Sequence, residues 1–138
     1  RQDGTLVDLI ERHALSFGSE GELRRTPVDE SSRREALVHA LAELDGEVMA
    51  AWARDEAVDS ATLHQAIRRL TCAGVVVPVL CGAALKNRGV QPVLDAVVRY
   101  LPSPQDRRLP QGLVADAASA ACGFVFKTDV DAHVGSLA

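Results

Sequence analysis

The sequence lacks the features that mark a membrane-spanning, disulfide-bonded or strongly basic protein. It contains no run of about 18 apolar residues, so no transmembrane helix is predicted. Its three cysteines form no C-x-x-C pair, and their odd number favours a reduced, intracellular protein over a disulfide framework. The formal net charge of −4 gives no overall basic field, so direct sequence-specific binding to nucleic acid is not expected.

Motifs for phosphate and metal chemistry are absent as well. No G-x-x-x-x-G-K-[S/T] loop occurs, so nothing in the chain is predicted to cradle phosphates or to place a hydroxyl on Mg²⁺. His13, His39 and His64 fall in separate predicted helices without a second histidine four residues on, whereas zinc needs three or four converging ligands. No nucleophile with a nearby base is recognisable either. On its own the chain is therefore predicted to be inactive as a catalyst, with no catalytic and no metal-binding residues.

What remains is an ordinary globular composition. The 138 residues are 47% hydrophobic and 25% charged, which suffices for one domain with a real core. The chain begins with Arg1 rather than methionine and shows no charged segment followed by an apolar one, as a secretory signal would. We therefore expect a fragment of a longer protein.

The first half is predicted to be helical. Approximate helical spacing of apolar residues predicts a helix over residues 6–17, ended by Gly18 and Gly21. Residues 22–30 are polar and predict an extended segment or loop, whose Arg24-Arg25 pair is interpreted as solvated surface.

Two further helices follow. An apolar stripe predicts one over residues 32–54, with Ser32 and Glu35 as a capping box and with Trp52 on the stripe, packed in the core. Another is predicted over residues 61–72, with Asp59 or Ser60 as its N-cap.

The best-defined stretch runs from Val75 to Pro104. Residues 75–80 are a continuous aliphatic run, typical of a strand buried on both faces of a parallel sheet. Residues 81–89 are small and polar, so they predict a loop. Residues 90–101 then place their apolar side chains on one helix face, and the prolines that follow end that helix. Ligands of open α/β sheets sit at such strand–loop–helix junctions.

The remainder divides into a linker and the beginning of another domain. Residues 105–118 mix proline, glycine and alanine without a clear period, as domain linkers do. Residues 122–127 predict a strand, residues 129–135 a turn, and the last residues a second strand.

Several of these segments resemble the elongation factor G family of translational GTPases. Cys81-Gly82-Ala83-Ala84-Leu85-Lys86-Asn87 is similar to that family's fifth G-box, which is usually Gly-Ser-Ala followed by Leu, Phe or Lys, and the helix ending Tyr100-Leu101-Pro102-Ser103-Pro104 is similar to the exit from its GTP-binding domain. Leu6-Val7-Asp8-Leu9-Ile10 and the helix from Thr62 to Arg69 look like parts of the family's G-prime insert. Phe126-Lys127 and Val134-Gly135-Ser136-Leu137 resemble the start of its second domain.

The resemblance implies a fold and a division into parts. An α/β fold is expected, namely a fragment of a P-loop GTPase domain with a helical insert, followed by the first strands of a β-barrel. Residues 1–74 would be the insert, 75–104 the last strand, loop and helix of the GTPase domain, 105–118 a linker, and 119–138 the start of the barrel domain.

The resemblance also implies a binding site. The loop at Gly82, Ala83, Ala84 and Leu85 would bind GTP by its base, with the backbone amide of Ala84 donating to guanine O6. Small residues are needed there because the backbone itself must approach the base. The chain departs from the family's pattern at Ala83, where serine is usual. Mg²⁺ would be bound by the full-length parent and not by this segment.

Partners and location follow from the same resemblance. The parent would hydrolyse GTP and drive translocation on the ribosome, in the cytoplasm. The alternatives are a ribosome-recycling paralogue of mitochondrial type, located in the mitochondrial matrix, and a non-catalytic module that binds the ribosomal stalk protein.

Overall fold

The computed structural model describes residues 4–18, 22–54, 56–107, 109–110, 112–116, 118–123, 125–133 and 135–137. They fall into two compact units, residues 1–101 and residues 102–138, and each unit is described by itself. Helices and strands are mixed, so the predicted α/β class is confirmed, although the sheets that are formed are small and antiparallel.

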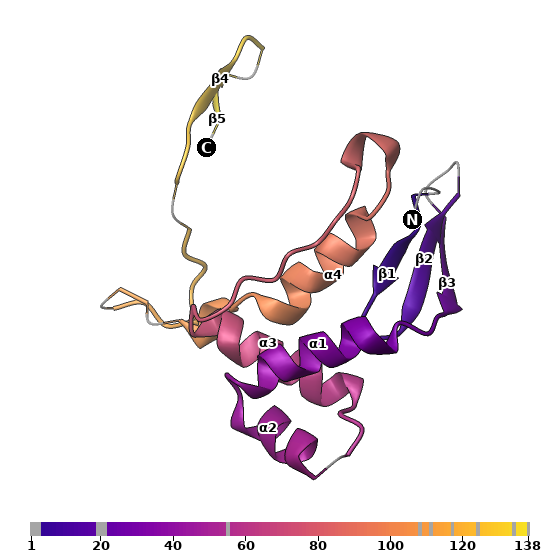
Figure 1. The fold of residues 1–138 in the computed structure, drawn as a ribbon. Coiled ribbons are helices and arrows are strands. Elements are labelled where there is room, and N and C mark those ends of the chain that lie inside the picture. The colour runs from indigo at the N-terminus through magenta and orange to yellow at the C-terminus, as the bar shows by residue number, and fades with distance from the viewer. Residues whose placement is uncertain are drawn as a thin grey trace. The chain divides into compact units, whose positions relative to one another are not determined.

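The first unit opens with a three-stranded antiparallel sheet. Its strands are β1 (Leu6–Asp8), β2 (His13–Phe17) and β3 (Leu23–Pro27), in the order β1-β2-β3 (Figure 1). The predicted helix over residues 6–17 is therefore wrong. The Asp8 carboxylate accepts hydrogen bonds from the amides of Ile10 and Glu11, both at 2.9 Å, and Arg12 adopts a left-handed φ of 59°. Such a side-chain turn diverts the backbone from helical pairing.

The predicted helix over residues 32–54 is in fact two helices. These are α1 (Ser31–Ala42) and α2 (Gly46–Ala53). Asp45 begins α2, because its carboxylate accepts from the amides of Glu47 and Val48. The Ser32–Glu35 capping box is also wrong, since Glu30 is the N-cap of α1 and makes no side-chain cap bond.

The helix α3 (Ser60–Cys72) confirms the third prediction. Its N-cap is Asp59, whose carboxylate accepts from the amide of Thr62 at 2.6 Å. The core lies where α1, α2 and α3 meet and includes Tyr100 from α4 (Val90–Tyr100); its buried members are Val38, Leu41, Ala42, Val48, Val58, Leu63, Ala66, Ile67, Leu70 and Tyr100.

Trp52 is not part of this core, contrary to the sequence prediction. It is 48% exposed and meets the ring of His39 edge-on, with 5.5 Å between the ring centroids. The break between α1 and α2 explains the error, because an apolar stripe continues in register only along an uninterrupted helix.

The predicted helix after the loop is confirmed as α4, but the strand predicted at residues 75–80 is not formed. Its backbone pairs with no strand among the residues that the structure describes, and Val77 and Val79 are 83% and 88% exposed. On α4, Leu94 and Val98 are 60% and 82% exposed. A strand needs a neighbour to satisfy its backbone groups, so sequence pattern alone does not make one.

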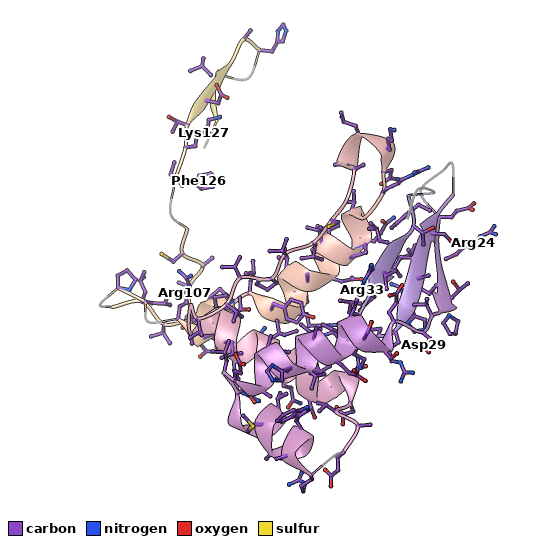
Figure 2. The ribbon with its side chains drawn as sticks, in the orientation of Figure 1. Arg24, Asp29, Arg33, Arg107, Phe126 and Lys127 are labelled. Carbon is purple, nitrogen blue, oxygen red and sulfur yellow. The ribbon has the colours of Figure 1, made fainter. Side chains whose placement is uncertain are left out.

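The second unit contains η2 (Pro104–Asp106) and a hairpin of β4 (Asp129–Asp131) and β5 (Gly135–Leu137). The strand predicted at residues 122–127 is not formed among its described residues, and Phe124 lies outside them. Phe126, labelled in Figure 2, is 90% exposed. Part of the predicted turn at residues 129–135 is the strand β4 itself.

None of the helices in the described part of the chain combines the length and apolar character needed to cross a membrane.

Candidate functional site

The loop between residues 75–80 and α4 is a single closed turn. Ala83 and Arg88 form an antiparallel bridge, in which the Ala83 amide donates to the Arg88 carbonyl at 2.9 Å and the Arg88 amide returns a bond of 3.1 Å. Between them lies the short helix η1 (Ala84–Lys86), in which the Lys86 amide donates to the Ala83 carbonyl. The four predicted site residues thus occupy one hydrogen-bonded turn.

Two glycines allow this turn to close. A methyl group on Gly82 would lie 2.9 Å from the Arg88 carbonyl oxygen, and one on Gly89 would lie 2.7 Å from the Cys81 carbonyl oxygen. Gly89 also has a φ of 78°, which side-chain-bearing residues rarely adopt. Both ends of the loop therefore depend on backbone-to-backbone contact.

The residues at the tip of the turn are exposed to solvent. Residues 82–87 are all exposed, and Leu85 is fully so. In the described part of the chain, the Ala84 amide donates to no protein acceptor. An unpaired N–H beside small side chains can donate to a ligand oxygen without a side chain in the way.

The helix α4 that follows the loop is fixed by a network around His64. The His64 Nδ1 atom lies 2.6 Å from the Tyr100 hydroxyl, and Nε2 lies 2.7 Å from Glu11 Oε1. The hydrogen bond from His64 lowers the pKa of Glu11 despite partial burial, and burial raises the pKa of Tyr100. Arg68 donates to the carbonyls of Arg99 and Leu101 at the end of α4. The β1–β2 turn, α3 and α4 are therefore joined.

A second polar cluster holds α2 against α3. Arg69 donates to both carboxylate oxygens of Asp45, at 2.9 to 3.1 Å, and to Glu47 at 2.9 Å. Burial opposes ionisation of Asp45, but the Val48 amide and the Arg69 guanidinium outweigh it, so the pKa of Asp45 lies below its usual value. Both carboxylate oxygens of Asp45 are hydrogen-bonded within this cluster, which indicates a structural role.

Sequence reasoning missed the His64 network entirely. Glu11 and His64 are 53 positions apart, and His64 and Tyr100 are 36 apart, so no local motif could reveal them. The only feature of the sequence that could have indicated this network is the position of His64 on the predicted helix over residues 61–72.

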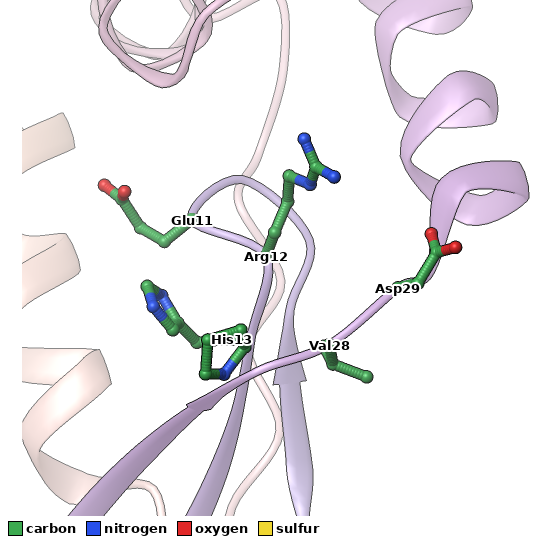
Figure 3. A pocket seen from close by; sticks show the side chains of 6 residues that line it. Glu11, Arg12, His13, Val28 and Asp29 are labelled. Atoms are coloured by element: carbon green, nitrogen blue, oxygen red, sulfur yellow. The ribbon is translucent and has the colours of Figure 1, made fainter.

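A shallow depression of about 500 Å³ lies at the β1–β2 turn (Figure 3). Its lining includes Glu11, Arg12, His13 and Asp29. In the view, the Glu11 and His13 side chains point to one side and the Asp29 carboxylate to another, so they do not converge on a common point. Among the described residues, no group of three or more His, Cys, Asp or Glu side chains could hold a metal ion.

The fold and the loop define a class: a unit of mixed helices and strands in which a turn closed by two glycines leads into an amphipathic helix. The chain is 40% identical to "Elongation factor G 2" of Desulfotalea psychrophila over 151 aligned positions, covering 96% of this chain and 22% of that relative. A crystal structure of a Thermus thermophilus protein matches with a TM-score of 0.65 and 25% identity, over 94% of this chain and 19% of that one. A comparison with models of protein families finds no match. The resemblance to the elongation factor G family is confirmed, and the chain spans about a fifth of the relative's length.

Proposed function

We propose that this chain is a segment of a translational GTPase of the elongation factor G kind, and that its loop from Gly82 to Leu85 reads the guanine base. The observation that carries the proposal is the similarity along 96% of the chain to a curated elongation factor G. The loop geometry supports the assignment, because Ala84 is an exposed residue whose amide makes no backbone hydrogen bond among the described residues, and a free N–H suits guanine O6 but not the amine of adenine.

The rest of the GTP site would come from other parts of the parent. This sequence contains no phosphate loop, so the phosphates and their Mg²⁺ would be held elsewhere, and hydrolysis would require those parts. The segment's contribution is base specificity. Its parent would act on the ribosome in translocation, and the recycling branch in mitochondria is the alternative role.

The substitution Ala84→Pro in the full-length protein tests the base-reading role. Proline removes the amide but suits the first position of a helix, which Ala84 occupies in η1. The preceding Ala83, at φ −138° and ψ 87°, lies outside the helical region that a following proline disfavours. The fold should therefore survive, while GTP affinity falls by about 1–3 kcal/mol, the cost of an unpaired buried acceptor.

Calorimetry with GTP and ATP gives the answer. ATP binding should be weak and should change little in the Ala84→Pro protein. The control is Ala83→Ser, which restores the family's usual residue and should leave GTP affinity unchanged or slightly tighter. A folded Ala84→Pro protein that binds GTP as the parent does would remove the loop from base recognition.

The stalk protein of the ribosome is the proposed partner of residues 6–74. The support is a set of large apolar side chains left exposed on or beside α2, namely Leu44, Met49 and Trp52 at 51%, 40% and 48%. Since Trp52 is the only tryptophan, its fluorescence reports titration of the chain with stalk protein directly. Binding should weaken in Met49→Asp and persist in the control Val98→Asp on α4. The absence of a signal at about 100 μM stalk protein would mean a binding free energy weaker than about 5.5 kcal/mol and would contradict the assignment.

A further inference from the structure

The end of the loop, unlike its tip, is covered by the sheet. Residues 82–87 are exposed, whereas Arg88 is half-buried and Gly89 is buried. The cover comes from β1 and the residues just before it. A methyl group on Gly89 would lie 3.1 Å from the Cδ1 atom of Leu6, and one on Gly4 would collide with the Arg88 guanidinium. Two successive loop residues therefore rest against the same part of the chain, which lies far earlier in the sequence.

These contacts reach the tip through the backbone. Gly89 packs on Gly82, whose own added methyl group would lie 3.5 Å from the Gly89 Cα atom. Arg88 is bridged to Ala83 by two backbone hydrogen bonds. Because Ala83 directly precedes Ala84, any shift of residues 88 and 89 moves the amide of Ala84.

The His64 network fixes the same strand at its other end. Glu11, in the turn that leaves β1, binds His64 at 2.7 Å, and Arg34 donates to the carbonyls of Leu9 and Ile10. The Ser60 hydroxyl also donates to the Ile10 carbonyl, at 2.8 Å. The turn after β1 is thus anchored to α1 and α3, which gives the strand a rigid base from which to support the loop.

We propose that Leu6 is a positioning residue for guanine recognition: its side chain holds Gly89 in place and so sets the direction of the Ala84 amide. The inference rests on the proposed function of the loop. It makes base specificity depend on a strand that lies in a different segment of the sequence and touches no nucleotide in this assignment.

The test compares two nucleotides in the full-length protein. GTP carries O6 and a proton on N1, whereas the triphosphate of 2-aminopurine riboside keeps the ring and the 2-amino group but lacks both. Because a main-chain amide can donate only to O6, the change in the affinity ratio between a variant and the wild-type protein reports the hydrogen bond to the Ala84 amide. We expect Leu6→Ala to lower this ratio by about three- to tenfold, the usual worth of one such bond, by weakening GTP and sparing the analogue.

Matched variants separate positioning from general damage. Leu6→Met keeps the length of the side chain and should retain the wild-type ratio. Val7→Ala makes a similar truncation on the same strand, but successive side chains of a strand point to opposite faces, so its ratio should not change. If Leu6→Ala fails to fold, Leu6→Val takes its place, because it shortens the side chain but removes much less apolar volume.

Each result decides the matter. A wild-type ratio in a folded Leu6→Ala or Leu6→Val protein overturns the inference, and so does an equal loss for both nucleotides, which would indicate a purely structural role. If Ala84→Pro lowers the ratio and the Leu6 variants do not, only the role of Leu6 is refuted. If the wild-type protein shows no preference for GTP over the analogue, the proposed function of the loop and the role of Leu6 are refuted together.

Discussion

Removal of the Asp45 carboxylate should destabilise the first unit by an amount that can be divided into two parts. Asp45 caps α2 through the amides of Glu47 and Val48, and it also pairs with Arg69 of α3. Loss of an N-cap costs about 1 kcal/mol. Loss of hydrogen bonds to a charged partner costs about 1.5–3 kcal/mol. Because the Arg69 side chain is 43% exposed and keeps Glu47 as a second partner, the lower end of that range applies.

We therefore expect Asp45→Ala to lower the free energy of unfolding by about 2–3 kcal/mol. Asp45→Asn should cost only about 1–2 kcal/mol, because asparagine is an equally good N-cap but cannot pair with a cation. The control is Glu47→Gln, which removes an exposed partner of Arg69 and should change stability by less than about 0.5 kcal/mol. Urea denaturation of the chain followed by circular dichroism measures all three.

The pH dependence gives an independent check. The pKa of Asp45 is lower in the folded state than in the unfolded one, so its contribution is complete above about pH 4 and is lost as the pH falls through the folded-state value. The difference in stability between the wild-type protein and Asp45→Asn should thus shrink on acidification. Equal losses for Asp45→Ala and Asp45→Asn at pH 7, or a difference that persists in acid, would refute this account of the cluster.

Two other substitutions test the packing of the first unit. Gly82→Ala should lower the free energy of unfolding by at least about 1 kcal/mol, because the new methyl group would lie 2.9 Å from the Arg88 carbonyl oxygen. Thermal unfolding measures this loss of stability, and an unchanged stability would mean that the loop closes differently. Arg34→Met should lower the free energy of unfolding by about 2–4 kcal/mol, because the carbonyls of Leu9, Ile10 and Val58 lose the donor that they share. Hydrogen exchange should show faster opening of the β1–β2 turn, and unchanged protection there would contradict the anchoring role of Arg34.

Sequence reasoning succeeded where one local signal was sufficient. The helix α3 combines a strong apolar face with a capping aspartate at residue 59, and α4 combines such a face with the proline that follows Leu101. Both were predicted nearly to their ends. The loop between residue 81 and residue 89 was also predicted, because its residues are small and polar and include two glycines.

It failed where a competing interaction decided the backbone. The spacing of Leu6, Leu9 and Ile10 fits a helix, but the Asp8 side chain binds the next amides and a hairpin forms. Asp45 likewise captures two amides and interrupts the apolar stripe before Trp52. In the candidate site, the turn was predictable from its small residues, whereas its support by Leu6 depends on a contact between distant segments that no periodicity records.

The close backbone contact between Gly82 and Gly89 has a consequence for how variation in this loop can be interpreted. In a saturation library across residues 81–89, the two glycine positions should be depleted by any selection for folding alone, because a side chain at either one meets a carbonyl oxygen. The exposed tip at Leu85 and Lys86 should tolerate most substitutions under that selection. A second selection for nucleotide binding should deplete the same glycine positions and, in addition, substitutions at the tip. The difference between the two depletion maps would therefore outline the ligand's footprint without a bound structure.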